Sequence, residues 1–86
     1  MSPAVVEVHF PHDRLASEEY GSDELLLNCL DKVNDSPEED GMPLRAWIIK
    51  QAHDALVKKP KTRELIVKPT ALKNSSTQFR IVIDEE

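Results

Sequence analysis

The sequence predicts an α+β fold in two layers, a small three-stranded sheet covered on one face by two helices, in the order β-α-α-β-β. Apolar and polar residues alternate near the N-terminus and in two segments near the C-terminus, which is the period of a half-buried strand. Between them, two stretches repeat apolar residues every three to four positions, as amphipathic helices do. With 86 residues and 40% hydrophobic content, we expect a single domain, 1–86, with frayed ends at 1–3 and 84–86.

The first strand is expected over residues 4–10. Its apolar face carries Val6, Val8 and Phe10. Pro11 ends the strand, because proline cannot donate a hydrogen bond to a sheet ladder. We expect residues 11–21 to form a polar loop.

The first helix is expected to begin after Ser22, a residue type that caps helices. Its apolar stripe follows a spacing of three and four residues through Leu26, Cys29, Leu30 and Val33. A free cysteine in such a stripe is most often a small core residue. We therefore expect Cys29 to be buried and unreactive.

The second helix is expected from Pro43 to about Lys58, with Pro60 ending it. Its apolar face is defined by Leu44, Ile48, Ala52 and Ala55, with Ile49 and Leu56 beside it. Before it, residues 36–39 read Ser-Pro-Glu-Glu, a capping-box spacing that predicts a short helical turn.

Two further strands are expected over residues 63–68 and 78–84, separated by a loop that includes 74–77. Their alternating apolar residues are Leu65 and Val67, then Phe79, Ile81 and Ile83. Because the two strands are neighbours in sequence, we expect them to pair as an antiparallel hairpin.

Charge is divided along the chain. Residues 13–40 hold ten acidic and two basic residues, a net charge of −8, whereas residues 41–80 hold nine basic and two acidic ones, a net charge of +7. Such a division favours charged partners and steers their encounter, although it does not identify them. It would also allow copies of the chain to associate head to tail.

We find no pattern that predicts catalysis, a cofactor or a metal site, and we expect a protein that is not an enzyme. His9, His12 and the neighbouring Asp13 are fewer ligands than a zinc site needs at a recognised spacing. We interpret His53 and Asp54 as a surface pair. Cys29 is the one cysteine, so no internal disulfide can form. No apolar run approaches the roughly 20 residues of a membrane helix, and we expect a cytoplasmic protein.

Three features suggest a surface for a partner protein. The first is the densest basic cluster, comprising Lys58, Lys59, Lys61 and Arg63. The second is Trp47, which lies roughly 130° from the centre of the second helix's apolar stripe and could anchor an interface, or be covered by another segment. The third is a second, acidic surface formed by Glu38, Glu39 and Asp40. We therefore predict a small protein-binding module, such as an adaptor, regulator or inhibitor.

The alternative is a nucleic-acid-binding domain that uses residues 58–63. The order of elements is similar to the arrangement in KH domains, which join two helices by a Gly-X-X-Gly loop. Here residues 37–43 contain one glycine and three acids, which repel phosphate. Aromatic side chains for base stacking are also few, namely Phe10, Tyr20, Trp47 and Phe79. A third possibility is an accessory subunit of an enzyme.

Overall fold

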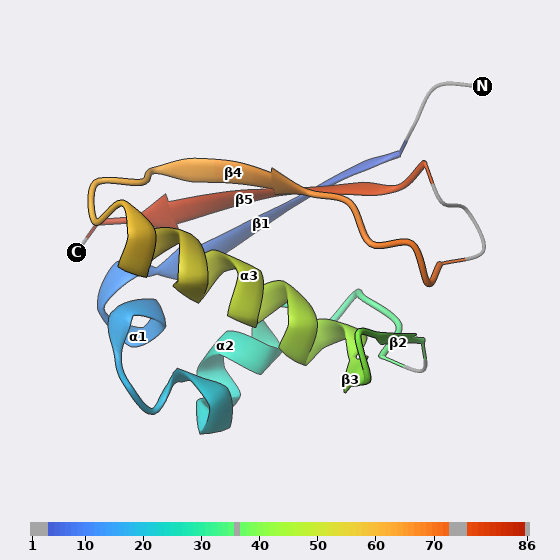
Figure 1. The fold of residues 1–86 in the computed structure, drawn as a ribbon, viewed down its shortest axis with the longest axis horizontal. Helices are drawn as coiled ribbons and strands as arrows, with labels where there is room; N and C mark the ends of the chain where they lie inside the picture. The colour runs from blue at the N-terminus through green and yellow to red at the C-terminus, as the bar shows by residue number, and fades with distance from the viewer. Residues whose placement is uncertain (1–3, 36, 73–75, 86) are drawn as a thin grey trace.

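A three-stranded sheet forms one layer of the protein (Figure 1). The computed structural model describes residues 4–35, 37–72 and 76–85. The strands are β1 (Val5–Pro11), β4 (Glu64–Val67) and β5 (Gln78–Asp84), in the spatial order β1-β5-β4. β5 pairs with β4 in antiparallel fashion, as the predicted hairpin requires, and with β1 in parallel.

Helices cover one face of this sheet and form the second layer (Figure 1). The longest is α3 (Leu44–Lys58), which begins within one residue of its predicted start and ends where predicted. The others are α1 (His12–Ala16), a 3₁₀ turn η1 (Tyr20–Ser22) and α2 (Glu24–Asn28). The predicted α+β class and its small three-stranded sheet are confirmed.

The hydrophobic core lies between the two layers. Most of the apolar side chains predicted to face inward are buried, among them Val8, Phe10, Leu26, Leu30, Ile48, Ala52, Leu56, Val67, Phe79, Ile81 and Ile83. Val6, Cys29 and Leu65 are half-buried at its margin. In β4, exposed and inward-facing residues alternate as predicted, and the apolar Ile66 falls on the outer face, where it is 48% exposed.

The prediction of a polar loop over residues 11–21 is wrong. This segment contains α1 and η1, and Leu15 of α1 is fully buried against the core. The helix cap is also displaced by one residue, because Asp23 rather than Ser22 accepts hydrogen bonds from the amides of Leu25 and Leu26. Asp23 also pairs with Arg14 of α1, which ties the two helices together.

α2 is shorter than predicted. Its apolar spacing continues to Val33, but the helix ends at Asn28 and the chain continues in tight turns, with the Val33 amide donating to the Leu30 carbonyl at 2.9 Å. Arg45 of α3 explains the change. Its Nε donates to the Val33 carbonyl at 2.9 Å and its guanidinium also reaches the Asp31 carbonyl. Tertiary hydrogen bonds thus outweigh the helical periodicity.

A hairpin stands where a helical turn was predicted before α3. It consists of β2 (Glu38–Glu39) and β3 (Met42–Pro43). Asp40 and Gly41 join them with φ angles of 52° and 77°, which is the requirement of a two-residue turn with both central residues left-handed. Asp-Gly is the sequence signal for this turn. The proposed cap, Ser36, lies outside the described residues.

The chain ends differ partly from the prediction. Residues 1–3 and 86, which we expected to fray, lie outside the described residues, as do 74 and 75 of the predicted loop. Asp84, in contrast, is the last residue of β5 and its carboxylate contacts His9 of β1.

Candidate protein-interaction surface

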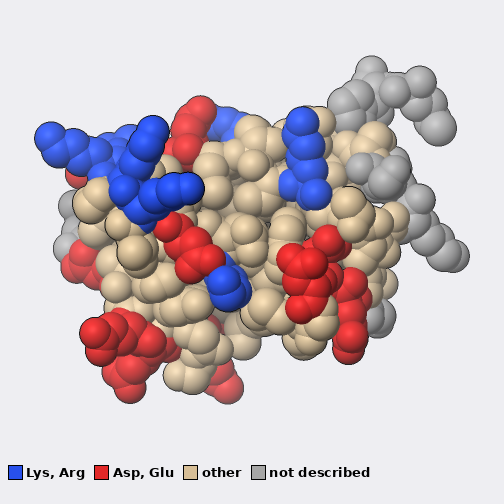
Figure 2. Space-filling model, viewed as in Figure 1, with Lys and Arg blue, Asp and Glu red and all other residues tan. Residues whose placement is uncertain are grey.

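Four basic side chains lie together at the C-terminal end of α3. Lys58 is the last residue of the helix, Lys59 caps it, and the other two precede β4. We call this group the basic surface, and it comprises Lys58, Lys59, Lys61 and Arg63. All four residues are exposed. Figure 2 shows a concentration of basic side chains at the upper left, where α3 ends and the chain turns into β4.

The turn that carries the basic surface is held by backbone hydrogen bonds. The Lys59 amide donates to the Ala55 carbonyl at 2.9 Å, which closes the last turn of α3. The amide and hydroxyl of Thr62 then both donate to the Lys59 carbonyl, at 2.9 and 2.7 Å. Because Pro60 has no amide hydrogen and a fixed φ, it helps to stop the helix here. The lysines are therefore displayed from a defined turn.

Three cations of the basic surface are available to a partner. Arg63 forms an ion pair with Glu85 near the C-terminus. No carboxylate of the described residues pairs with Lys58, Lys59 or Lys61. These ammonium groups therefore keep a positive potential at this end of the molecule although the whole chain carries a formal charge of −5.

An apolar depression lies beside the basic surface. It has a volume of about 210 Å³ and is formed where α1 meets the end of α3. Its lining residues are His12, Ala16, Leu56, Val57 and Pro60. Val57 is 69% exposed and Pro60 separates two of the lysines in sequence, so apolar contact area and positive charge adjoin. Sequence analysis missed this feature because it did not predict α1.

Of the two interpretations of Trp47, interface anchor or covered side chain, the structure has the covered one. The side chain is 9% exposed and belongs to the hydrophobic core. Its Nε1 donates to the Asp40 carboxylate at 3.1 Å, so the β2–β3 hairpin satisfies the indole. This is the covered state that sequence analysis held open, and the covering element is one that it did not predict.

The acidic residues 38–40 have intramolecular roles. The Glu39 carboxylate accepts hydrogen bonds from the amides of Thr70 and Ala71, both at 2.8 Å, and from the Thr70 hydroxyl at 3.0 Å. Burial alone would raise the pKa of Glu39, but these donors outweigh it and lower the pKa. Asp40 receives the indole of Trp47. Glu39 therefore fastens the hairpin to the chain after β4. The Glu38 side chain makes no hydrogen bond or ion pair within the described residues, although its backbone pairs with Pro43 in the hairpin.

Two side chains of reactive types, His53 and Cys29, are engaged in contacts within the protein. His53 is not a surface partner of Asp54, because its Nδ1 bonds to the Leu15 carbonyl at 2.7 Å and its ring stacks on Tyr20 at 3.8 Å. Cys29 is half-buried and donates to the Leu25 carbonyl. Burial, and then nearby carboxylates, raise the pKa of its thiol, which lowers the thiolate fraction that reacts.

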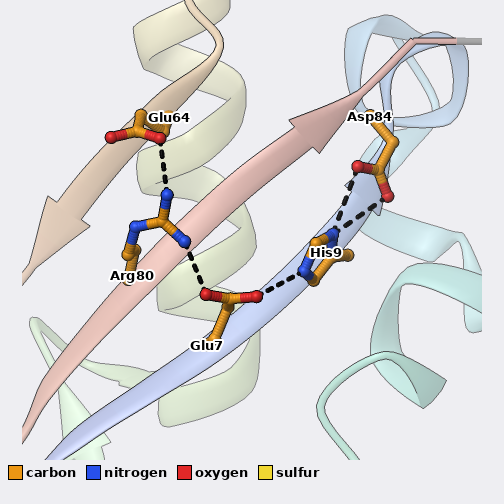
Figure 3. Close-up of polar contacts among 5 residues, drawn as sticks. All are labelled: Glu7, His9, Glu64, Arg80 and Asp84. Atoms are coloured by element: carbon orange, nitrogen blue, oxygen red, sulfur yellow. Dashed lines mark hydrogen bonds and ion pairs between the residues drawn. The ribbon is translucent and has the colours of Figure 1, made fainter.

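A polar network lies on the sheet face opposite the helices (Figure 3). Arg80 of β5 bridges Glu7 of β1 and Glu64 of β4. Glu7 also contacts His9 Nε2 at 2.8 Å, and His9 Nδ1 lies 3.2 Å from both carboxylate oxygens of Asp84. The hydrogen bond to Glu7 and then that to Asp84 raise the pKa of His9. The network joins all three strands.

Among the described residues, no three His, Cys, Asp or Glu side chains are placed to hold a metal ion together. Within the same part of the chain, no helix is both long enough and apolar enough to cross a membrane.

Comparisons with known proteins identify a family and a solved structure that this chain is similar to. A family model described as hypothetical proteins matches residues 6–85. A search of curated proteins finds no match. Among solved structures, a hypothetical protein from Trypanosoma cruzi, described with its chemical shift assignments, is 62% identical, with a TM-score of 0.78. The match covers 100% of this chain and 94% of that one.

Proposed function

The chain belongs to the family of hypothetical proteins that this model describes, and from its geometry we propose that it is a small, non-catalytic protein-binding module. The basic surface and the apolar depression together form its binding site. The observation that carries the proposal is their adjacency at the end of α3.

The chemistry of the site favours one class of partner. Apolar area supplies binding energy once water leaves it, and a rim of cations selects for negative charge and accelerates encounter. A segment with acidic residues around one or two aliphatic side chains satisfies both parts of the site. The aliphatic side chain would occupy the depression beside Leu56 and Val57, and carboxylates would reach Lys58, Lys59 and Lys61.

We favour a protein partner over nucleic acid. A binding site for single strands normally offers aromatic faces for stacking. Of the four aromatic residues, Phe10, Trp47 and Phe79 are buried in the core, and Tyr20 stacks on His53. The hairpin between α2 and α3 also carries Glu38, Glu39 and Asp40, which would repel a phosphate backbone. A role as adaptor, regulator or inhibitor in the cytoplasm, where the free thiol of Cys29 would persist, fits this proposal.

Capture from cells that express the protein tests the proposal. Wild-type protein is compared with a variant in which Lys58, Lys59 and Lys61 are changed to Gln, because these three cations have no carboxylate partner in the described chain. We expect a captured partner to be lost or strongly reduced in the variant, mainly through a lower association rate, with a larger difference at low salt.

A matched control removes charge elsewhere on the surface. Lys32→Gln with Lys68→Gln changes two exposed lysines outside the basic surface, and Lys58→Gln with Lys61→Gln changes two within it. Only the second pair should weaken capture. Equal capture by both pairs, with unchanged thermal stability, would overturn the proposed site. Capture of nucleic acid rather than protein by the wild type would overturn the proposed class of partner.

A further inference from the structure

β1 has a free edge. Among the described residues its one strand neighbour is β5, which lies beside it in Figure 3. The two strands pair in parallel from Val5 and Gln78 to Pro11 and Asp84. The Gln78 amide donates to the Ala4 carbonyl at 2.9 Å. In a parallel pair, alternate residues direct both backbone groups to the same neighbour. From Val5 to His9, every second residue therefore directs its N–H and C=O to the free side, and these residues are Val5, Glu7 and His9.

The outer backbone groups of Glu7 are unpaired within the described chain, because no hydrogen bond of residues 4–35, 37–72 or 76–85 reaches them. An unpaired row of donors and acceptors on a strand is a template for a further strand. The other edge strand, β4, has four residues and is followed by Pro69, which makes it a poorer template.

A groove runs along this edge. It has a volume of about 350 Å³ and lies between β1 and the turns that follow α2. We call it the β1 groove, and its apolar lining comprises Val6, Val8, Cys29, Leu30 and Val33. The turns bond to themselves, as in the Leu30 amide to the Leu27 carbonyl at 3.0 Å, and leave the edge of β1 open.

The walls of the β1 groove carry more negative than positive charge. Glu7 and Asp31 line it, with Lys32 as the one basic residue of the lining. Glu7 also pairs with Arg80 and His9, but the network of Figure 3 sets three carboxylates, those of Glu7, Glu64 and Asp84, against these two bases. Cys29 also lines the groove, and its pKa is raised by burial first and then by carboxylates that include Asp31 of the same lining. A positively charged segment complements this groove.

We propose that the β1 groove binds an extended, basic segment of a partner protein, which adds as a strand beside β1. Alternate side chains of an added strand point to opposite faces of the sheet. Those on the helical side would be apolar and enter the groove against Val8 and Leu30. Those on the open side would be basic and face Glu7, whose side chain is 52% exposed. This inference does not rest on the proposed function, because it concerns a different surface and the opposite charge.

A peptide of alternating sequence, acetyl-Lys-Val-Lys-Val-Lys-Val-amide, is the probe. Binding to the ¹⁵N-labelled protein should shift amide resonances at residues 5–9 and 28–33 and slow hydrogen exchange of the Glu7 amide. Two control peptides separate the contributions. One replaces each lysine by glutamate, and the other carries N-methyl groups on alternate amides. Each should bind about tenfold more weakly or worse. The glutamate peptide loses charge complementarity, and the N-methylated peptide loses one or two backbone hydrogen bonds.

A variant tests the edge itself. Glu7→Pro removes the outward N–H and leaves the hydrogen bonds to β5 untouched, as proline on an edge strand can. Glu7→Gln keeps that N–H and serves as its matched control. We expect Glu7→Pro to abolish binding. Glu7→Gln loses the carboxylate that faces the lysines but keeps the N–H, so it should bind more weakly than the wild type and still saturate. If Glu7→Pro does not fold, the N-methylated peptide tests the same hydrogen bonds on the wild type.

Three results would overturn the inference. They are equal binding of the N-methylated peptide, shifts confined to the end of α3, and pairing of β1 with a second copy strong enough to exclude the peptide. The probe reports on residues 5–9 and the capture experiment on the end of α3, so failure of one proposal is distinguishable from failure of the other.

Discussion

Single side chains account for most differences between the sequence-based predictions and the structure. The four basic residues after α3 are exposed as their composition and position indicate. Trp47 and His53 both lie off the apolar stripe of α3. Trp47 is covered by the β2–β3 hairpin, and His53 contacts Tyr20 and Leu15. A helical wheel describes one helix, whereas the segments that pack on its flanks depend on tertiary structure.

His9 offers a prediction at this scale. Its protonated ring donates to Glu7 and Asp84, which raises its pKa above the ordinary 6.5. Because the folded pKa is the higher one, the stabilisation is complete below pH 6.5 and is lost as the pH rises through the folded value. Glu7→Gln should lower the pKa of His9 in an NMR titration.

Glu64→Gln is the control for that titration, because it removes a carboxylate from the same network without touching His9. It should leave the pKa of His9 nearly unchanged. An equal pKa in the wild type and in Glu7→Gln would contradict the account of this network.

At the scale of elements, long periodic segments were predictable and short ones were not. β5 and the end of α3 match their predicted bounds, because patterns of seven and fifteen residues carry enough signal. α1 has five residues, and β2 and β3 have two each. Such short elements depend on contacts rather than on propensity. The Asp40-Gly41 hairpin could have been predicted, because its turn signal is present in the sequence, but the capping-box spacing was interpreted as a helical turn instead.

Leu30 tests whether a residue beyond the end of α2 still contributes to the hydrophobic core. It is 1% exposed although it lies in a turn rather than in a helix. Leu30→Ala should reduce the free energy of unfolding by about 2–5 kcal/mol, from lost burial and the cavity that remains. Urea denaturation measures this loss. Leu25→Ala removes the same atoms from a side chain that is 42% exposed and should cost under about 1 kcal/mol. Similar losses in the two variants would contradict the assigned core.

Gly41 tests the hairpin turn. With φ at 77° and nothing within 4 Å of a built Cβ, a substitution there meets backbone strain and no clash. Gly41→Ala should lower the free energy of unfolding by about 1–2 kcal/mol, the cost of a left-handed residue with a side chain. Gly21→Ala, also in open space but without a positive φ, is the matched control and should be near neutral. Equal effects would place the turn in another conformation.

At the scale of the whole molecule, the division of charge in the sequence survives folding only in part. Ion pairs join Arg14 to Asp23, Lys50 to Asp54, and Arg80 to two glutamates, so much of the charge is neutralised locally. The charge that is not neutralised is concentrated at particular places on the surface. Cations project from the end of α3 beside the apolar depression, and the lining of the β1 groove includes the carboxylates of Glu7 and Asp31. The sequence predicted the basic surface, because its lysines and arginine are close together in the chain. It predicted neither the apolar depression nor the β1 groove, because each is formed by segments distant in the chain.

The most direct measurement of the central claim is a titration of the ¹⁵N-labelled protein with acetyl-Glu-Leu-Glu-Glu-Leu-Glu-amide. We predict saturable amide shifts at residues 12–16 and 55–63, weakened by salt and lost when Lys58, Lys59 and Lys61 are changed to Gln. Shifts elsewhere, or tighter binding of a single-stranded oligonucleotide to the same residues at physiological salt, would contradict the account of this surface as a site for an acidic protein segment.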